Sequence, residues 1–139
     1  MGHRELLVFR DRLGLAREHL RLVELKGPGP GNCLVVDVES DSGVEVFSGL
    51  GERRRSSKEV ANAVVDQVEA FVAADVPVGE HLADQLLIPL AIAGGGAFRT
   101  MALTEHTRTN IEIVKLFLDV EIDVVDEASG AVRIVVNRR

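Results

Sequence analysis

Residues 81–96 read HLADQLLIPLAIAGGG, and this stretch decides how the second half of the chain folds. Its apolar run is interrupted by Asp84 and Gln85 at consecutive positions, and by Pro89. The pattern predicts a helix over residues 81–93. Pro89 should kink or divide this helix, because proline lacks the backbone N–H that a helix interior uses. The three glycines at 94–96 predict the helix stop, although they would also let a ligand or another backbone segment approach closely.

The residues after this stretch alternate between strand and helix patterns. Ile111, Val114 and Leu118 recur at helical spacing and should share one side of a short helix. A terminal hairpin should turn at Ala128-Ser129-Gly130. The expected elements are a strand over 98–103, a polar loop over 104–110, a helix over 111–118, and hairpin strands over 120–125 and 131–136.

The first half of the chain also mixes helices with short strands. Ser56 and Glu59 have the spacing of a capping box, in which each side chain satisfies a free backbone amide of the first helical turn. Valines at every fourth position should line one face of the helix that follows. These valines are Val60, Val64, Val68 and Val72. The expected elements are helices over 4–20 and 56–75, strands over 22–25, 33–39 and 44–49, and a loop over the Pro- and Gly-rich residues 27–32.

This order of elements predicts an α+β fold made of two small sheet-and-helix units, each with helices packed against one face of a sheet. We place the boundary between the units at residues 76–79, which separates 1–75 from 76–139.

Composition limits the classes of protein to consider. The 139 residues are 46% hydrophobic and 27% charged, which is ordinary for a globular protein. Cys33 is the one cysteine, which fits a reducing, cytoplasmic location. No apolar stretch is long enough to span a membrane, and the N-terminus lacks a signal-peptide pattern. The net charge of −6 argues against a dedicated nucleic-acid binder, since phosphate neutralisation dominates such binding.

His106 has the neighbourhood best suited to chemistry. It lies in a polar segment that runs into a predicted helix start, where Thr107 or Thr109 is a plausible N-cap. Free amides at a helix start favour an anion, and Arg108 adds a planar cation suited to phosphate. The neutral imidazole is abundant at neutral pH, so His106 could act as a base, a ligand or a nucleophile. The alternative is a surface histidine in a capping loop.

Asp84 and Gln85 also have two readings. They could bind a magnesium ion or hydrogen-bond a base or phosphate, or they could form a polar helix face at a domain boundary. His3 and His19 belong to the solvent side of the first helix, and the arginines at 53–55 are typical of a solvated loop. With no Trp or Tyr, the chain has no obvious stacking platform for bases.

Two motifs together resemble the RNA 3′-terminal phosphate cyclase family. Residues 82–96 are similar to the family signature LADQLLxPLALAGGG, and residues 106–110 match its HxxTN element. Gly29-Pro30-Gly31-Asn32 and Val38-Glu39-Ser40 resemble the family's insert region. His81 departs from the family, in which an aromatic residue such as tyrosine is common at this position.

The resemblance implies an ATP-dependent ligase with a divalent metal, Mg²⁺ or Mn²⁺. Its substrate is an RNA 3′-phosphate end, which it converts to a 2′,3′-cyclic phosphate through a covalent histidine–AMP intermediate. His106 would be the nucleophile, and His81, Asp84 and Gln85 would lie at the nucleotide site. Arg108 as a phosphate ligand is our own addition from its charge and position.

The resemblance also implies how the chain is organised. Residues 1–75 would be most of an insert-like α/β domain without its first strand. Residues 76–139 would be the C-terminal part of a catalytic domain built from βαβαββ repeats. We therefore expect the chain alone to be inactive, and to self-associate through exposed strand edges. The alternative is a non-catalytic cyclase-like module of RNA processing or ribosome assembly.

Overall fold

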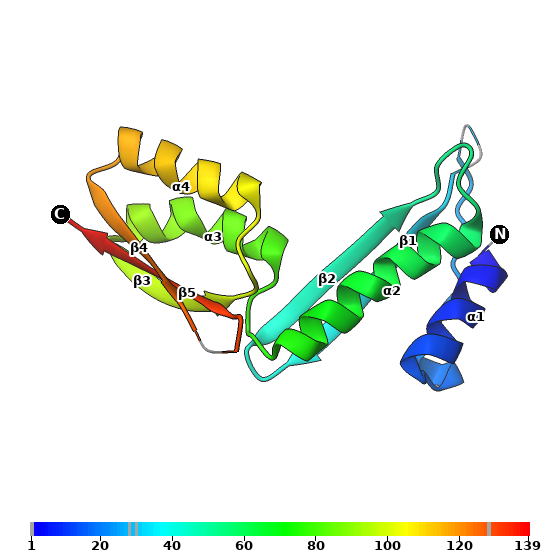
Figure 1. The fold of residues 1–139 in the computed structure, drawn as a ribbon. Helices are drawn as coiled ribbons and strands as arrows, with labels where there is room; N and C mark the ends of the chain where they lie inside the picture. The colour runs from blue at the N-terminus through cyan, green and yellow to red at the C-terminus, as the bar shows by residue number, and fades with distance from the viewer. Residues whose placement is uncertain (1, 28, 30, 128) are drawn as a thin grey trace. The chain divides into compact units, whose positions relative to one another are not determined.

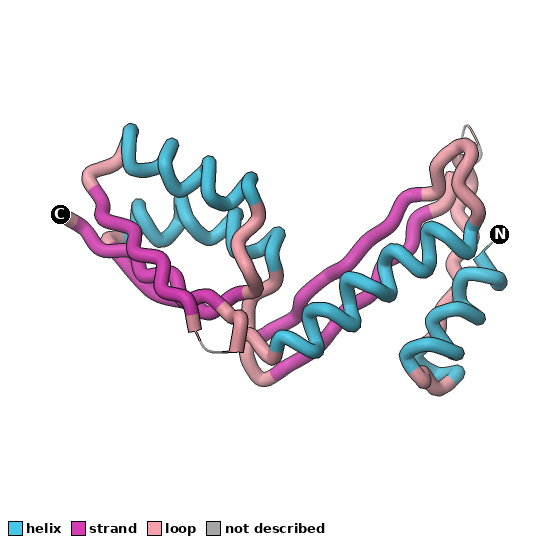
Figure 2. The backbone as a smooth tube through the Cα atoms, viewed as in Figure 1, coloured by secondary structure: helices cyan, strands magenta, loops and turns pink. Residues whose placement is uncertain are grey.

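The computed structural model describes residues 2–27, 29, 31–127 and 129–139 (Figures 1 and 2). It contains helices and two small sheets, so the predicted α+β class is confirmed. The chain divides into two compact units, which are described separately. Unit 1 holds residues 1–39 and 46–70, and unit 2 holds residues 40–45 and 71–139. The assignment of 1–75 and 76–139 to an insert and a catalytic domain stays a prediction.

Unit 1 is a two-stranded sheet with helices. Its elements are α1 (Gly2–Leu13), a 3₁₀ turn (Arg17–His19) and most of β1 (Cys33–Ser40), β2 (Gly43–Leu50) and α2 (Ser57–Ala74). The predicted helix over 4–20 was too long, because Gly14 adopts a left-handed φ of 64° and breaks it. The strand expected over 22–25 does not form. In the loop expected over 27–32, Pro28 and Pro30 lie outside the described residues.

The α2 helix begins with the predicted capping box. The Ser56 backbone N–H donates to Glu59 Oε2 over 2.7 Å, and the Glu59 N–H donates to Ser56 Oγ over 3.2 Å. The prediction that valines at every fourth position line one helix face was wrong for Val72, which is 60% exposed. Each step of four residues overshoots a full helical turn by about 40°, so three steps carry Val72 away from the buried face. Phe71 takes the buried position instead.

Unit 1 packs α2 closely against β2. A Cβ atom on Gly49 would lie 2.5 Å from Val64 Cγ2, so only glycine permits this approach. On the other side of the helix, Arg12 of α1 binds Asp66 and Glu69 of α2 at 2.7 and 2.6 Å. These carboxylates raise the pKa of the Arg12 guanidinium, mainly through the hydrogen bond to Asp66.

Unit 2 is a three-stranded antiparallel sheet with two helices over one face (Figure 1). The strand order is β3-β5-β4, which places the last strand of the chain in the centre. Its elements are α3 (Glu80–Ala93), β3 (Gly95–Thr100), α4 (Glu105–Phe117), β4 (Val120–Asp126) and β5 (Val132–Arg138). The predicted terminal hairpin is therefore confirmed, although Ala128 in its turn lies outside the described residues.

Residues 81–96 form most of α3 and the first residues of β3. Pro89 lies inside α3, which is not divided there. Gly94 ends the helix in a left-handed conformation, as predicted. The next strand starts earlier than expected, because Gly95 and Gly96 pair with β5. A Cβ on Gly95 would lie 2.9 Å from the Val136 carbonyl oxygen, so the close approach here is to the chain's own backbone.

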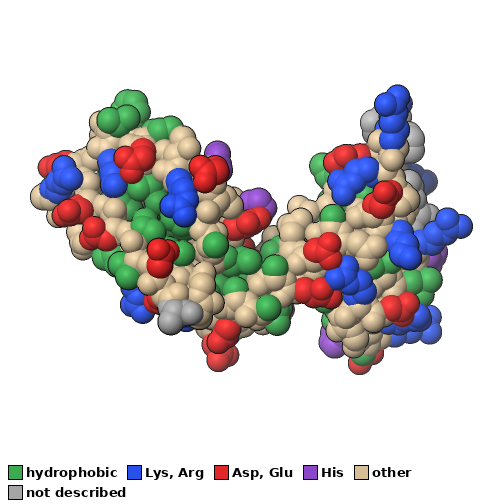
Figure 3. Space-filling view, viewed as in Figure 1, with side chains coloured by type: hydrophobic (Ala, Val, Ile, Leu, Met, Phe, Trp, Pro, Cys, Tyr) green, Lys and Arg blue, Asp and Glu red, His purple; other side chains and the backbone are tan. Residues whose placement is uncertain are grey.

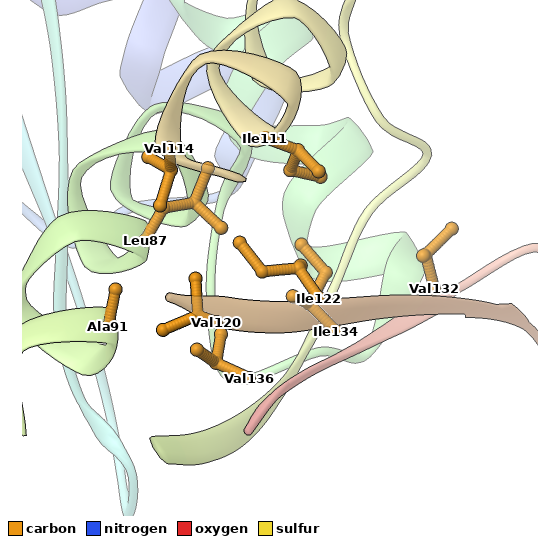
Figure 4. Close-up of a cluster of buried hydrophobic side chains, with 9 residues drawn as sticks. All are labelled: Leu87, Ala91, Ile111, Val114, Val120, Ile122, Val132, Ile134 and Val136. Atoms are coloured by element: carbon orange, nitrogen blue, oxygen red, sulfur yellow. The ribbon is translucent and has the colours of Figure 1, made fainter. Parts of the chain in front are cut away.

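The core of unit 2 lies between the helices and the sheet (Figure 4). Leu87 of α3, Ile111 and Val114 of α4, and Ile134 of β5 are almost completely buried in it. The other members of the cluster are Ala91, Val120, Ile122, Val132 and Val136. Ile111 and Val114 confirm the helical side predicted from their spacing. Burial of this cluster fixes α3 and α4 against each other.

Several apolar side chains of unit 2 remain exposed. Ile92, Leu116 and Phe117 are mostly accessible. Self-association through such surfaces or through strand edges stays a prediction. Among the described residues, no helix is both long and apolar enough to cross a membrane.

Candidate functional site

The start of α4 brings His106 into the first turn of a helix. The polar residues 104–110 were expected to form a loop, which was wrong, because α4 already begins at Glu105. The N-cap is Thr104, not Thr107 or Thr109: its hydroxyl accepts a hydrogen bond from the Thr107 N–H over 3.1 Å. By residue type, Thr104, Thr107 and Thr109 were all compatible with the cap, and the structure selects Thr104.

His106 contacts a carboxylate of the neighbouring helix. Its Nε2 atom lies 3.1 Å from Oδ2 of Asp84 on α3. The imidazole is 81% exposed, whereas the Asp84 side chain is only 19% exposed. The ring is therefore open to a ligand on its outer side and held by a half-buried anion on its inner side.

Asn110 completes this arrangement from the next turn of α4. Its Nδ2 group donates to Asp84 Oδ1 over 2.8 Å and lies 3.4 Å from the Asp84 backbone carbonyl oxygen. Both carboxylate oxygens of Asp84 thus have a partner, one from each of two residues four apart on α4. We call Asp84, His106 and Asn110 the helix-pair triad.

The N-terminus of α4 adds a local preference for anions. Helix geometry leaves the N–H groups of Glu105 and His106 without intrahelical acceptors. The positive end of the helix dipole lies at the same turn. Thr107 is fully buried, and its hydroxyl lies 3.0 Å from that of Thr104, which stiffens this turn. A phosphate beside His106 would meet free backbone donors.

The other predicted site residues lie apart from these contacts. His81 is 72% exposed on the first turn of α3, with its Nε2 3.7 Å from Glu80 Oε1. Gln85 is exposed and follows Asp84 on the same helix. Arg108 has its Nε 3.9 Å from Glu105 Oε1. The structure brings together Asp84 and His106, and their roles as nucleotide ligand and nucleophile stay predictions.

Arg108 lines a different feature, an open pocket of ≈ 330 Å³. This pocket lies along α4 and β4, and neither His106 nor Asp84 lines it. Both apolar and charged side chains line it. The lining residues are Leu103, Arg108, Ile111, Glu112, Lys115, Ile122, Asp123 and Val124. Figure 3 shows such apolar surface between cationic and anionic side chains on unit 2.

The remaining candidates from the sequence are plain surface groups. His3, His19 and Cys33 are exposed. Within the described part of the chain, no group of three His, Cys, Asp or Glu side chains is arranged to hold a metal ion.

From the sequence, Asn110 was noted only as the last residue of the HxxTN element, and no role was predicted for it. Its spacing of four from His106 puts both on one helix face, which was the available signal. That face could be recognised only if residues 105–110 were taken as helical.

Known proteins match the chain over this region and beyond. A family model described as RNA 3′-terminal phosphate cyclase matches residues 42–124, which is more than half of the chain. A protein of that name from Koribacter versatilis is 40% identical over 132 residues, covering 94% of this chain and 37% of its own length. Its namesake in Pseudomonas fluorescens is 41% identical over 124 residues, covering 88% of this chain and 36% of its own length.

A third protein of that name, from Salmonella paratyphi C, is 37% identical over 139 residues, which is all of this chain and 40% of that protein. The chain thus spans 36–40% of the length of these relatives. The motifs at 82–96 and 106–110 agree with the family match. This chain belongs to the RNA 3′-terminal phosphate cyclase family.

Proposed function

We propose that this chain carries the nucleophile of an ATP-dependent cyclase that converts an RNA 3′-phosphate to a 2′,3′-cyclic phosphate. The observation that carries the proposal is the helix-pair triad: an exposed imidazole held by a carboxylate at the start of a helix. The relatives are named RNA 3′-terminal phosphate cyclase, which agrees with the proposed cyclisation.

In the first step, the ring nitrogen of His106 that does not face Asp84 attacks the α-phosphorus of ATP. A P–N bond forms, the P–O bond to the leaving group breaks, and pyrophosphate departs with that electron pair. Positive charge develops on the ring, and Asp84 Oδ2 at 3.1 Å stabilises it. Backbone N–H groups at the start of α4 favour the phosphate oxygens.

In the second step, an oxygen of the RNA 3′-phosphate attacks the same phosphorus. The P–N bond breaks, and His106 recovers its lone pair. The adjacent 2′-hydroxyl then attacks the activated 3′-phosphorus, which closes the cyclic phosphate. AMP leaves, and the hydroxyl proton passes to solvent or to a base.

Asp84 acts in this scheme as a positioning residue, and Asn110 orients Asp84. Gln85 and His81 of α3 are proposed to contact the nucleotide, and Arg108 to contact a phosphate. The structure separates Arg108 from the triad, so its contact requires a ligand that reaches past the first turn of α4.

A divalent cation would offset phosphate charge as pyrophosphate leaves. The described residues do not form a site for it by themselves, because no group of three His, Cys, Asp or Glu side chains among them is arranged to hold a metal ion. Mg²⁺ is commonly held by one or two carboxylates together with substrate phosphates. We therefore assign the cation no ligand in this chain and no separate step.

The test is covalent labelling with ATP that carries the label on its α-phosphate. A full-length family member should become labelled in an acid-labile linkage, and the variant that corresponds to His106→Ala should not. The isolated chain should stay unlabelled, because its imidazole is 81% exposed and the pocket along α4 and β4 does not include it.

The matched control is the substitution that corresponds to His19→Ala, since His19 is exposed in unit 1 and outside the triad. It should leave labelling unchanged, and circular dichroism should show that both variants are folded. Labelling that persists without the His106 imidazole would refute the assignment. A full-length protein that is never labelled would favour the non-catalytic alternative.

A further inference from the structure

The strongest charged feature outside the triad is the turn between β2 and α2, residues 51–55, which we call the basic turn. It contains Arg53, Arg54 and Arg55, all exposed. Its base is held on both sides: the Gly51 N–H donates to the Asn32 carbonyl oxygen over 2.8 Å, and the Ser56 capping box begins α2 directly after it. Both ends of the turn are thus anchored to unit 1.

The three arginines differ in how their charge is compensated. Arg55 lies 3.6 Å from Glu52, and its charge also contributes to lowering the pKa of Glu59, after the hydrogen bonds from Ser56. Arg53 and Arg54 have no ion pair within the described parts of the chain. Two guanidinium groups are therefore free to bind an anion from outside.

The charge of the chain is divided unequally between its units. Residues 1–39 and 46–70 carry ten basic and ten acidic side chains, whereas residues 40–45 and 71–139 carry six and twelve. The whole net charge of −6 thus belongs to unit 2, which also holds the triad. In unit 1, Arg12 occupies Asp66 and Glu69, so acidic groups there are partly neutralised. Figure 3 shows Lys and Arg side chains gathered on this unit.

We propose that the basic turn binds the sugar–phosphate backbone of single-stranded RNA through Arg53 and Arg54. Guanidinium groups match phosphate in charge and in planar hydrogen-bond geometry. With no Trp or Tyr in the chain, contacts to the backbone rather than stacking should dominate, so sequence preference should be weak. The identity of the polyanion as RNA rests on the proposed function.

The test measures RNA binding by this chain without ATP, using fluorescence anisotropy of a short labelled single-stranded RNA with a 3′-phosphate. Each phosphate contact on single-stranded nucleic acid contributes about −0.7 to the slope of log affinity against log salt. Arg53→Ala with Arg54→Ala should therefore make the slope less steep by about 1.4. Between about 50 and 200 mM salt, the wild-type affinity should fall about sevenfold more than that of the double variant.

The matched control is Arg138→Ala with Arg139→Ala, which removes the same charge from exposed residues of unit 2 that have no ion pair in the described chain. It should keep the wild-type slope. Equal effects of both double variants, or no RNA binding even at low salt, would overturn the proposal. So would a loss of binding to phosphatidylserine vesicles in the Arg53/Arg54 variant while RNA binding is unchanged.

The outcome is separable from that of the labelling test. The RNA measurement contains no ATP, so its result does not depend on adenylylation of His106. If the full-length protein is not labelled but the Arg53/Arg54 variant still changes the salt dependence of RNA binding, only the proposed reaction is refuted. If labelling occurs but the Arg53/Arg54 variant binds RNA with the wild-type salt dependence, only the proposed RNA-binding surface is refuted.

Discussion

Replacing Asn110 tests the helix-pair triad most directly. In Asn110→Ala, Asp84 Oδ1 loses its donor at 2.8 Å. A hydrogen bond to a charged partner contributes about 1.5–3 kcal/mol, and the partial exposure of this pair favours the lower end. We expect Asn110→Ala to lower the free energy of unfolding of this chain by about 1.5 kcal/mol.

Asn110→Asp keeps the shape of the side chain and reverses its effect. A second carboxylate then faces Asp84 where an amide donated. Two like charges about 4 Å apart repel by about 4 kcal/mol at an effective dielectric constant of about 20, which is an upper bound because the side chains can turn apart. Asn110→Asp should therefore be less stable than Asn110→Ala at neutral pH.

The pH dependence of this difference follows from the charge. Repulsion exists only when both carboxyls are ionised, so the deficit of Asn110→Asp should shrink as acid protonates carboxyls and should grow as the pH rises. Urea unfolding followed by circular dichroism at several pH values measures it. Thr109→Ala, at an exposed position on the same helix, is the control and should change stability by less than about 0.5 kcal/mol.

Asn110→Ala also has a functional readout in a full-length relative. Without the Asn110 contact, Asp84 is free to turn from His106. If this costs the transition state about 1.4 kcal/mol of stabilisation, adenylylation should be about tenfold slower. If Asn110→Asp were as stable as Asn110→Ala at every pH, Asn110 would not face Asp84. The account of the triad would then be wrong.

Two further predictions concern the stability of unit 2. Leu87→Ala should lower the free energy of unfolding in urea by about 2–5 kcal/mol, because the Leu87 side chain is fully buried. The control, Ile88→Ala at a half-exposed position, should lower it much less. Equal losses of stability would contradict the packing of α3. Arg99, then Arg133, hold the pKa of Glu127 below its ordinary value, so this carboxylate stabilises the fold above its unfolded-state pKa, and the contribution is lost as the pH falls through the folded one. Glu127→Gln should therefore be less stable than wild type at neutral pH but not at about pH 2; a gap that does not close would contradict this.

Much of the fold could be predicted because its signals are local. The Ser56 capping box, the stop at Gly94 and the terminal hairpin each depend on a few neighbouring residues, and all three were confirmed. The errors arose where local signals are degenerate. Thr104, Thr107 and Thr109 are all acceptable N-caps by type, and only packing of α4 on α3 selects Thr104.

The site was predictable in part, for a similar reason. His106 and Asp84 were singled out from their neighbourhoods, but they are 22 residues apart, and no spacing rule places them in contact. That contact requires α3 and α4 to pack side by side over the sheet, which the buried core of Leu87, Ile111 and Val114 enforces. Arg108 shows that closeness in sequence does not ensure contact. It is only two residues from His106, but two residues turn a helix by about 200°, so Arg108 lies on another face of α4.

A helical position for His106 changes what the proposed chemistry requires of its surroundings. In a loop, the imidazole would have to be ordered by the ligand. In the first turn of α4, the backbone is already fixed by Thr104, and the ring has an anion on one side and helix N–H groups nearby. The attack on phosphorus creates positive charge on the ring and transfers negative charge to phosphate oxygens. In the proposed reaction, Asp84 and the helix start would offset these two changes separately, so neither group would have to move.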